Sequence, residues 1–380
     1  MRLVFVTGSL PSGGAERHAM GLLDALARRG HECHGICVKP LQVPLAGVVR
    51  STTPHSLNAA RYLDKRAIAD FAAMLSSIRP DAIIAANGYA LMYATLARHR
   101  AGLNCRIVVT WHSTKLLNLK EFLQMLAYRP LFWLADCTVF LCRRQMRRWR
   151  WRGLLSRRNT VIYNGIDAEA FRDRSSLAQR QELRRQLGWR PADYVIGIPA
   201  LLRVEKNHLQ LLEAVARLRR QGIPARALLI GDGELRGAIE QRMRAPDLEN
   251  VVHITGLQQD VRPWLAACDV ATLCSVTETF SLAALEAMAM GKPVVLSDVG
   301  GAAEMVEPGW NGLLFPPRDI DAFVDRLATL SDADAARRMG SNARRLVELR
   351  FGATTMVDRY EELLAGLCRS DGGAAGVACS

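Results

Sequence analysis

The sequence predicts an α/β protein with two doubly wound parallel-sheet domains, and three observations support this prediction. The chain has 380 residues, which exceeds one ordinary compact domain and suits two. Short apolar strands alternate with helical stretches, a pattern that favours parallel sheets covered by helices on both faces. The alternation begins at Arg2 and begins again at Tyr194, so each half should build its own sheet.

In the first half, an apolar run predicts a strand at 2–7, and a loop at 8–14 that contains glycine follows it. A helix is expected at 15–29, because its apolar residues have helical spacing and Gly30 ends it. Further strands are expected at 82–86 and 106–110, and a further helix at 65–78.

The second half repeats the pattern after the turn at 163–167, which we expect to be a hinge. Its strands are expected at 194–200, 227–230, 251–255, 270–273 and 293–297, and its helices at 209–221 and 283–290. The expected domains are an N-terminal domain at 1–165, a C-terminal domain at 166–353, a helix at 354–369 that packs back on the N-terminal domain, and a flexible Gly/Ala-rich tail at 370–380.

Composition limits the protein's surroundings and partners. The nine cysteines form no CxxC or Cys/His spacing, which favours buried thiols in a reducing compartment over a zinc site. The apolar run at 3–6 is too short for a signal peptide, and no 18-residue uncharged apolar run occurs. We therefore expect a cytoplasmic location. The formal net charge of +13 indicates an anionic partner.

Two short segments could bind phosphate. Gly13 and Gly14 stand at a strand-to-helix junction, where backbone N–H groups and the helix dipole favour anions, although a plain tight turn would have the same sequence. Arg203 and Lys206 follow a predicted strand of the second half. Two cations at that edge suit a diphosphate, and a solvated loop is the alternative.

Two glutamates mark the segment 275–286, which leaves a strand and enters a helix. Glu278 falls in the loop and Glu286 in a strongly apolar helical stretch, where a carboxylate is seldom found without a partner. Both could accept hydrogen bonds from sugar or ribose hydroxyls. The backbone N–H groups at 279–282 could hold phosphate or sugar oxygens, with ordinary helix capping as the alternative.

His112 directly follows the predicted strand at 106–110, so it belongs to the edge where α/β proteins bind ligands, unless it is a satisfied, partly buried histidine. A metal-bridged diphosphate would favour an Asp-x-Asp loop. The single match, Asp332-Ala333-Asp334, begins a predicted helix and is better explained as a cap. We therefore expect no metal and no other cofactor.

The segment 143–158 contains eight arginines and two tryptophans. Arginine beside tryptophan is typical of an anionic bilayer surface, and we expect Arg147, Arg148, Trp149 and Trp151 to contact a membrane. A solvated basic face and nucleic-acid binding are the alternatives, but no nucleic-acid recognition motif accompanies the segment. Nucleic acid is therefore not expected as a partner.

Several motifs together resemble the retaining GT-B glycosyltransferases of family 4. Glu278 and Glu286 have the Glu-x7-Glu spacing of that family. The matching motifs are GGAERH at 13–18, VIYNGID at 161–167, EKNH at 205–208, IGDGELR at 230–236, AMAMGKPVVLSDVGGAAEMV at 287–306 and WNGLLFPPRD at 310–319. The resemblance covers nearly the whole chain. It implies two Rossmann-like domains across a cleft, of which the first binds the acceptor and the second the nucleotide sugar.

The resemblance also implies roles for individual residues. The expected catalytic residues are Glu278, beside the donor sugar, His112, beside the transferred sugar, and Lys206, at the diphosphate. The donor-binding residues are Gly14, Arg203, Lys206, Gly231, Asp232, Phe280, Ser281, Leu282 and Glu286, and the acceptor side comprises Gly13, Gly14 and His112.

Two positions depart from the family pattern. Leu201 stands where the family often has an arginine five residues before its lysine, so Arg203 is a candidate substitute. Thr279 and Ser281 stand where glycines are common, which could narrow the space for the donor sugar.

The expected function is that of a hexosyltransferase-type glycosyltransferase. It would move a sugar with retention from a nucleotide-diphosphate sugar, UDP-linked or GDP-mannose, to a glycan or polyprenyl-linked acceptor. The setting would be polysaccharide or lipopolysaccharide assembly at the inner face of the plasma membrane. The alternatives are a nucleotide-sugar epimerase of the same architecture and a noncatalytic binder of anionic polymers.

Overall fold

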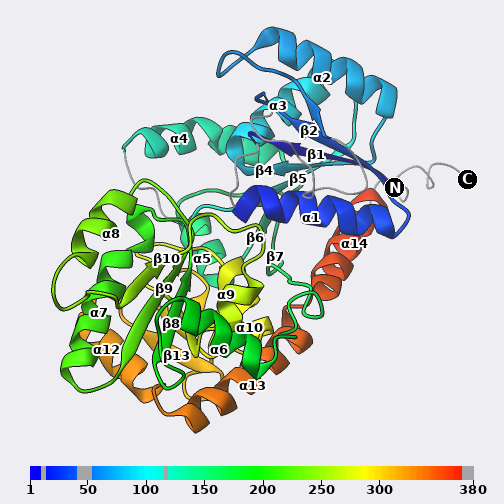
Figure 1. Cartoon of the computed structure of the whole chain (residues 1–380). Coiled ribbons are helices and arrows are strands. Elements are labelled where there is room, and N and C mark those ends of the chain that lie inside the picture. The colour runs from blue at the N-terminus through cyan, green and yellow to red at the C-terminus, as the bar shows by residue number, and fades with distance from the viewer. Residues whose placement is uncertain (10–13, 41–53, 115–118, 370–380) are drawn as a thin grey trace, which may run out of the picture. The chain divides into compact units, whose positions relative to one another are not determined.

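A computed structural model describes residues 1–9, 14–40, 54–114 and 119–369 (Figure 1). The chain forms two compact units. Unit 1 comprises residues 1–164 together with 355–380, and unit 2 comprises residues 165–354. Each unit has one sheet whose strand pairs are all parallel, which confirms the predicted fold class.

Unit 1 contains a seven-stranded sheet in the order β3-β2-β1-β4-β5-β6-β7. Strand β1 lies between β2 and β4, so the direction of winding reverses beside it, and ligand crevices form at such switch points. The strands are β1 Arg2–Thr7, β2 Glu32–Cys37, β3 His55–Ser56, β4 Ala82–Ala86, β5 Arg106–Trp111, β6 Cys137–Phe140 and β7 Arg158–Val161.

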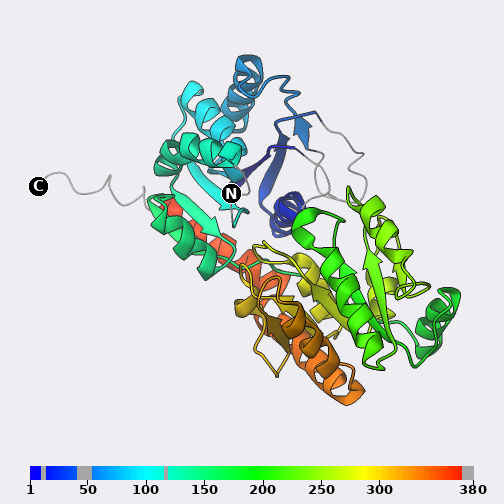
Figure 2. The ribbon, with the colours of Figure 1, turned by 90° about the vertical axis from the view of Figure 1, so that its left-hand side faces the viewer.

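The two faces of this sheet carry separate hydrophobic clusters, because successive strand residues point to opposite sides. Val4 and Val6 of β1 pack with α2, α3, α4 and α5, whereas Leu3 and Phe5 pack with α1 and α14. Figure 2 shows α2 and α3 across the sheet from α1. The helices are α1 Gly14–Arg28, α2 Lys65–Ile78, α3 Asn87–Arg100, α4 Leu119–Leu134, α5 Arg143–Trp151 and α14 Ala353–Arg369.

The last helix, α14, lies beside α1 in unit 1. Its Tyr360 and Leu364 are fully buried in the same cluster as Leu22 and Leu23 of α1. At the surface, Arg29 forms ion pairs with Asp358 and Glu361 of α14. The C-terminal helix therefore completes one face of the sheet of unit 1.

Unit 2 contains a six-stranded sheet in the order β10-β9-β8-β11-β12-β13, with its switch point at β8. The strands are β8 Tyr194–Pro199, β9 Ala225–Ile230, β10 Val252–Ile254, β11 Val270–Leu273, β12 Val294–Ser297 and β13 Gly312–Phe315. The helices are α6 Leu177–Gln186, the 3₁₀ helix η1 Val204–Lys206, α7 His208–Arg220, α8 Arg236–Met243, α9 Arg262–Ala266, α10 Leu282–Ala289, α11 Ala302–Met305, α12 Ile320–Thr329 and α13 Ala333–Arg350.

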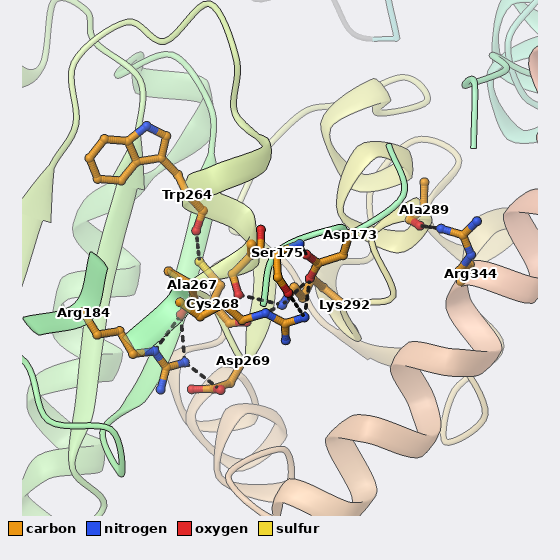
Figure 3. A network of polar contacts seen from close by, with 12 residues as sticks. Asp173, Ser175, Arg184, Trp264, Ala267, Cys268, Asp269, Ala289, Lys292 and Arg344 are labelled. Carbon is orange, nitrogen blue, oxygen red and sulfur yellow. Dashed lines mark hydrogen bonds and ion pairs between the residues drawn. The ribbon is translucent and has the colours of Figure 1, made fainter. Parts of the chain in front are cut away.

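A buried network of hydrogen bonds and ion pairs lies at the amino edge of this sheet (Figure 3). The Lys292 ammonium donates to the carbonyls of Ala266 and Cys268 at 3.0 and 2.9 Å, and it lies 3.7 Å from the Asp173 carboxylate. Arg184 donates to the Ala267 carbonyl at 2.7 Å. These cations satisfy carbonyls in the turn that precedes β11, so we assign them a structural role.

Two further features concern the chain's surroundings. Within the described ranges, no helix combines the length and hydropathy needed to cross a membrane. The eight cysteines of those ranges are free thiols.

Candidate functional site

Three loops of unit 2 meet at the carboxyl edge of its sheet. They follow β9, β8 and β11, which are neighbours in the sheet, so their ends lie at one edge. Backbone hydrogen bonds join them: Leu202 N–H donates to the Asp232 carbonyl at 3.0 Å, and Val276 N–H donates to the Glu205 carbonyl at 2.8 Å. The predicted donor-binding residues of unit 2 follow these three strands.

Lys206 and Glu278 form the central contact of this edge. The Lys206 ammonium donates to the Glu278 carboxylate at 2.5 Å, and each side chain is about one-fifth exposed. Lys206 ends η1, where Asn207 adopts a left-handed backbone (φ 53°) that turns the chain into α7. The pair is accessible, and an incoming phosphate could take over the ammonium's hydrogen bonds.

Helix α10 begins at Leu282, a short distance along the chain from Glu278. Ser281 caps it, because its hydroxyl accepts a hydrogen bond from Ala284 N–H at 3.3 Å. The Phe280 ring is buried against Phe351, with ring centroids 5.3 Å apart, so the ring belongs to the core of unit 2. The helix start therefore offers backbone donors and a positive dipole end.

Glu286 lies within α10 and is 5% exposed. Glu286 is therefore on the second turn of α10, one turn after the residues that begin the helix. Leu282 is the first residue of the helix and is partly buried. A pocket bordered by Glu278, Thr279 and Ser281 opens beside this helix start.

A close backbone approach fixes the loop that holds Glu278. Gly300 has a left-handed backbone (φ 55°), and a Cβ atom there would lie 2.2 Å from the Glu278 carbonyl oxygen and 2.6 Å from that of Thr279. Gly301 N–H donates to the Thr279 carbonyl at 2.7 Å. Only glycine permits this contact, so the turn after β12 helps to position the carboxylate.

The other predicted residues of unit 2 contact neighbours other than Lys206 and Glu278. The Arg203 side chain is about half exposed, and its guanidinium lies 4.0 Å from Glu205. Gly231 passes so close to Ala200 that a Cβ atom would lie 2.3 Å from its carbonyl oxygen. The Asp232 carboxylate accepts a hydrogen bond from Arg236 of α8 at 2.8 Å.

In unit 1, His112 stands at the end of β5. Its N–H donates to the side chain of Asn87 at 2.9 Å, and its ring Nε2 lies 3.2 Å from the Thr110 hydroxyl. That hydroxyl also lies 3.4 Å from the Ala85 carbonyl, to which it donates. Burial and the neighbouring His18 hold the pKa of His112 well below its usual value, so the ring is neutral at pH 7.

His18 is a residue that the sequence analysis did not single out. Its ring packs edge-on against His112, with centroids 5.2 Å apart, and lies 6.0 Å from Tyr360. It is 5% exposed, neither ring nitrogen has a hydrogen-bond partner among the described residues, and burial lowers its pKa to about 4. Because His18 ends the GGAERH motif, the family resemblance could have identified it as a candidate site residue.

The other predicted residues of unit 1 are two glycines of the GGAERH motif and four residues of the arginine-rich segment. Gly14 is the first residue of α1, and Gly13 lies outside the described residues. Arg147 and Trp151 are exposed, and Arg148 is partly buried. The prediction for Trp149 is wrong: its side chain is fully buried, packs against Trp111 and donates to the Ser113 carbonyl at 2.7 Å. A buried indole cannot touch a membrane.

No group of three or more His, Cys, Asp or Glu side chains with a metal-binding arrangement occurs in the part of the chain that the structure describes. In unit 2 the candidate site consists of a cation, two carboxylates and a helix start, and in unit 1 the candidate residue is a neutral histidine.

Two family models match the chain. The model described as glycosyl transferases group 1 matches residues 193–333, and the model described as Glycosyltransferase Family 4 matches residues 12–170. The first falls within unit 2 and contains Lys206, Glu278 and Glu286. The second covers most of unit 1, including His112.

Among curated relatives, an Escherichia coli UDP-Gal:alpha-D-GlcNAc-diphosphoundecaprenol alpha-1,3-galactosyltransferase is 28% identical over 54% of this chain and 53% of its own length. A putative colanic acid biosynthesis glycosyltransferase of Salmonella typhimurium is 27% identical over 84% of this chain and 80% of its own length. The chain spans about half the length of several of the curated relatives it matches.

Solved structures share the fold. Anabaena HepE in complex with UDP superposes with a TM-score of 0.83 at 24% identity, covering 96% of this chain and 100% of that one. Sucrose-phosphate synthase from Thermosynechococcus elongatus gives a TM-score of 0.80 at 21% identity, covering 97% and 99% of the two chains.

Proposed function

The chain belongs to the group 1 glycosyltransferases with the GT-B fold, and we propose that it transfers a sugar from a nucleotide-diphosphate sugar to a glycan acceptor. One observation carries the proposal. The Lys206–Glu278 pair lies at the carboxyl edge of the sheet of unit 2, beside the capped start of α10. A cation and a helix start together suit a diphosphate, and a carboxylate next to them suits sugar hydroxyls.

In the proposed reaction, the bond between the anomeric carbon and the diphosphate breaks, and the nucleoside diphosphate leaves. Lys206 and the N–H groups at the start of α10 stabilise its growing negative charge. The acceptor hydroxyl attacks from the same face of the sugar, and its proton passes to the leaving phosphate, so the anomeric configuration is retained. Glu286 binds the ribose hydroxyls, and Glu278 contacts the donor sugar.

In the proposed reaction, His112 of unit 1 contacts the transferred sugar. Because its ring is neutral, one ring nitrogen is an acceptor, which suits a hydrogen bond from a sugar hydroxyl.

A UDP-sugar is the favoured donor, and GDP-mannose is the second candidate. The favoured donor is supported by the structural similarity to HepE, whose solved complexes contain UDP and UDP-glucose. The proposed acceptor is a lipid-linked or cell-surface glycan in polysaccharide or lipopolysaccharide assembly. It is supported by the E. coli relative, which is named for a diphosphoundecaprenol acceptor, and by the colanic acid relative.

The donor is tested by saturation-transfer NMR of the full chain against a panel of UDP- and GDP-sugars, with and without EDTA. We expect one nucleotide sugar to bind with or without EDTA. Binding should be lost in Lys206→Ala and kept in Lys65→Ala, which removes an exposed lysine of unit 1. The proposal fails if no nucleotide sugar binds, or if both variants bind alike.

The stereochemistry is tested separately, by NMR of the product formed with the identified donor and a lipid-linked acceptor. The expected product keeps the donor's anomeric configuration, and an inverted product would exclude retention. Conversion of the nucleotide sugar without any acceptor would instead support the epimerase alternative.

A further inference from the structure

Helix α4 presents an exposed apolar face in unit 1. Its Met125, Tyr128 and Phe132 are buried in the core, and these positions occupy one side of the helix. Between 122 and 134 the helix carries one charged residue, the partly buried Arg129, and the opposite side is otherwise apolar. It consists of Phe122 (43% exposed), Leu123 (56%), Leu126 (36%), Trp133 (58%) and Leu134 (53%).

The arginine-rich segment adjoins this helix. The Arg129 guanidinium of α4 donates to the carbonyl of Arg152, the residue that follows α5. Trp151, at the end of α5, is 94% exposed, and Leu155 is 38% exposed. We call the combination the α4–α5 surface: Phe122, Leu123, Leu126, Trp133, Leu134, Trp151 and Leu155, with the exposed arginines Arg143, Arg144, Arg147, Arg150 and Arg152.

The charge of this surface has one sign. Residues 122–158 contain nine arginines and a single acidic residue, Asp136. Asp136 is 6% exposed and pairs with Arg106 at 3.0 Å and with Arg98 and Arg157 at 3.8 Å, none of which belongs to the α4–α5 surface. Burial lowers the pKa of Arg148, and the neighbouring Arg152 and Arg144 lower it further, which reflects the crowding of positive charge.

We propose that the α4–α5 surface docks on an anionic lipid bilayer. The apolar side chains of α4 and the Trp151 indole enter the interface between headgroups and acyl chains, and the arginines lie at the level of the lipid phosphates. An apolar face flanked by arginine, with tryptophan at its border, is what such an interface binds. The fully buried Trp149 is excluded from this contact.

Other occupants fit less well. A nucleic acid would use the arginines but would leave the apolar face of α4 in water. A second copy packed about a two-fold axis would place the same arginine-rich segments against each other, at a cost in charge repulsion. A bilayer matches both the apolar and the cationic half of the surface.

The inference goes beyond the proposed function, because the surface lies in unit 1 and the nucleotide site in unit 2. It also explains how the enzyme could reach a lipid-linked acceptor. Vesicle binding and nucleotide binding are measured on the same protein, so either one can fail without the other.

The test is co-sedimentation of the full chain with vesicles of phosphatidylcholine alone, or of equimolar phosphatidylcholine and phosphatidylglycerol. We expect binding to the anionic vesicles only. Arg144→Gln/Arg147→Gln/Arg150→Gln should bind about 100-fold more weakly, since each interfacial arginine contributes roughly fivefold. The matched variant Arg172→Gln/Arg185→Gln/Arg337→Gln, exposed in unit 2, should bind as the unaltered chain does.

A second pair of variants tests the apolar side chains of the α4–α5 surface. Leu123→Gln/Trp133→Gln should weaken binding about tenfold or more, because both side chains lose apolar contact with the bilayer. Leu177→Gln/Leu349→Gln, at positions that are 69% and 67% exposed in unit 2, should leave it unchanged. A circular dichroism melt that keeps the cooperative unfolding of unit 1 shows that each variant of the α4–α5 surface is folded.

Depth is measured by quenching of tryptophan fluorescence with brominated lipids. Quenching should fall in Trp133→Phe/Trp151→Phe and persist in Trp310→Phe. The proposal is overturned if the unaltered chain binds neither vesicle, if the apolar variant binds like the unaltered chain, or if quenching does not depend on Trp133 and Trp151. It is also overturned if the apolar face mediates a dimer without lipid, seen as a sedimentation change that Leu123→Gln/Trp133→Gln abolishes.

Discussion

At the residue scale, the site depends on which charges are paired. Lys206 and Glu278 form an ion pair, so a diphosphate at Lys206 would compete with the carboxylate for the ammonium. Replacing Lys206 and replacing Glu278 should therefore change nucleotide binding in opposite directions, although we propose a role in the reaction for both residues.

We predict that Lys206→Met raises the Kd for UDP at least about tenfold, because it removes a charge-assisted hydrogen bond. Glu278→Gln should bind UDP as tightly as the unaltered chain or more tightly, because the amide no longer competes for Lys206. Both variants should lower the rate of sugar transfer, on the order of 100-fold. Calorimetric titration with UDP and a transfer assay check this, and equal weakening of UDP binding in both variants would contradict it.

His18 should make unit 1 sensitive to acid. Burial depresses its pKa from 6.5 to about 4, so the unfolded chain takes up the proton first as the pH falls. Stability is therefore lost between about pH 6.5 and pH 4, by about 2 kcal/mol at pH 5 for this residue. Urea unfolding of His18→Gln at pH 7 and pH 5 should show a loss smaller by about that amount. An unchanged pH dependence would rule out this role for His18.

At the element scale, the loop between β11 and α10 is positioned by its neighbours. Ser281 fixes where α10 begins, and Gly300 allows the turn after β12 to support the peptide groups of Glu278 and Thr279. The geometry of the carboxylate thus depends on a residue 22 positions away.

We predict that Gly300→Ala displaces this loop, since the new Cβ would overlap the Glu278 carbonyl oxygen. The variant should lose about 2 kcal/mol or more of stability and bind the donor sugar more weakly. Gly309→Ala is the matched control. It has a left-handed backbone (φ 83°) but no atom within 4 Å of the added Cβ, so it should lose only ~1 kcal/mol and keep donor binding. Equal donor binding by the two variants would count against the positioning role.

At the scale of the whole molecule, the two units differ in how the chain builds them. Unit 2 is one continuous segment, whereas unit 1 needs the distant helix α14 to cover one face of its sheet. Lys206, Glu278, Glu286 and the start of α10 all belong to unit 2.

We predict that residues 165–354, expressed alone, unfold cooperatively and bind UDP within about tenfold of the full chain, because the segment holds its own sheet and the donor residues. The counterpart, a chain that ends at residue 354, should lose the cooperative unfolding of unit 1, because the contacts of Tyr360 and Leu364 are removed. Circular dichroism melts and UDP titrations measure both. A segment 165–354 that folds but binds no UDP, while the full chain does, would contradict the assignment of the donor site.

Sequence periodicity located the elements that have strong patterns. The predicted ranges of β1, α2, β4 and β11 agree with the structure, because fully buried strands and amphipathic helices leave clear apolar patterns. Strand β2 was not predicted, since Glu32, His34 and Gly35 interrupt its apolar pattern, and β7 was missed because its residues are polar or only partly buried. Pairing with neighbouring strands, rather than composition, makes these segments strands.

In the candidate site, too, some features follow from the local sequence and others from tertiary contacts. The sequence by itself determined the alternation of strands and helices and the spacing of Glu278 and Glu286, because these are local properties of the chain. Only the tertiary structure decided that Lys206 meets Glu278, that His18 packs on His112, and that Trp149 is buried while Trp151 is exposed. Contacts between residues distant in the chain, and the burial of one tryptophan in an arginine-rich helix, depend on how the strands are ordered and on which side of each helix meets the sheet.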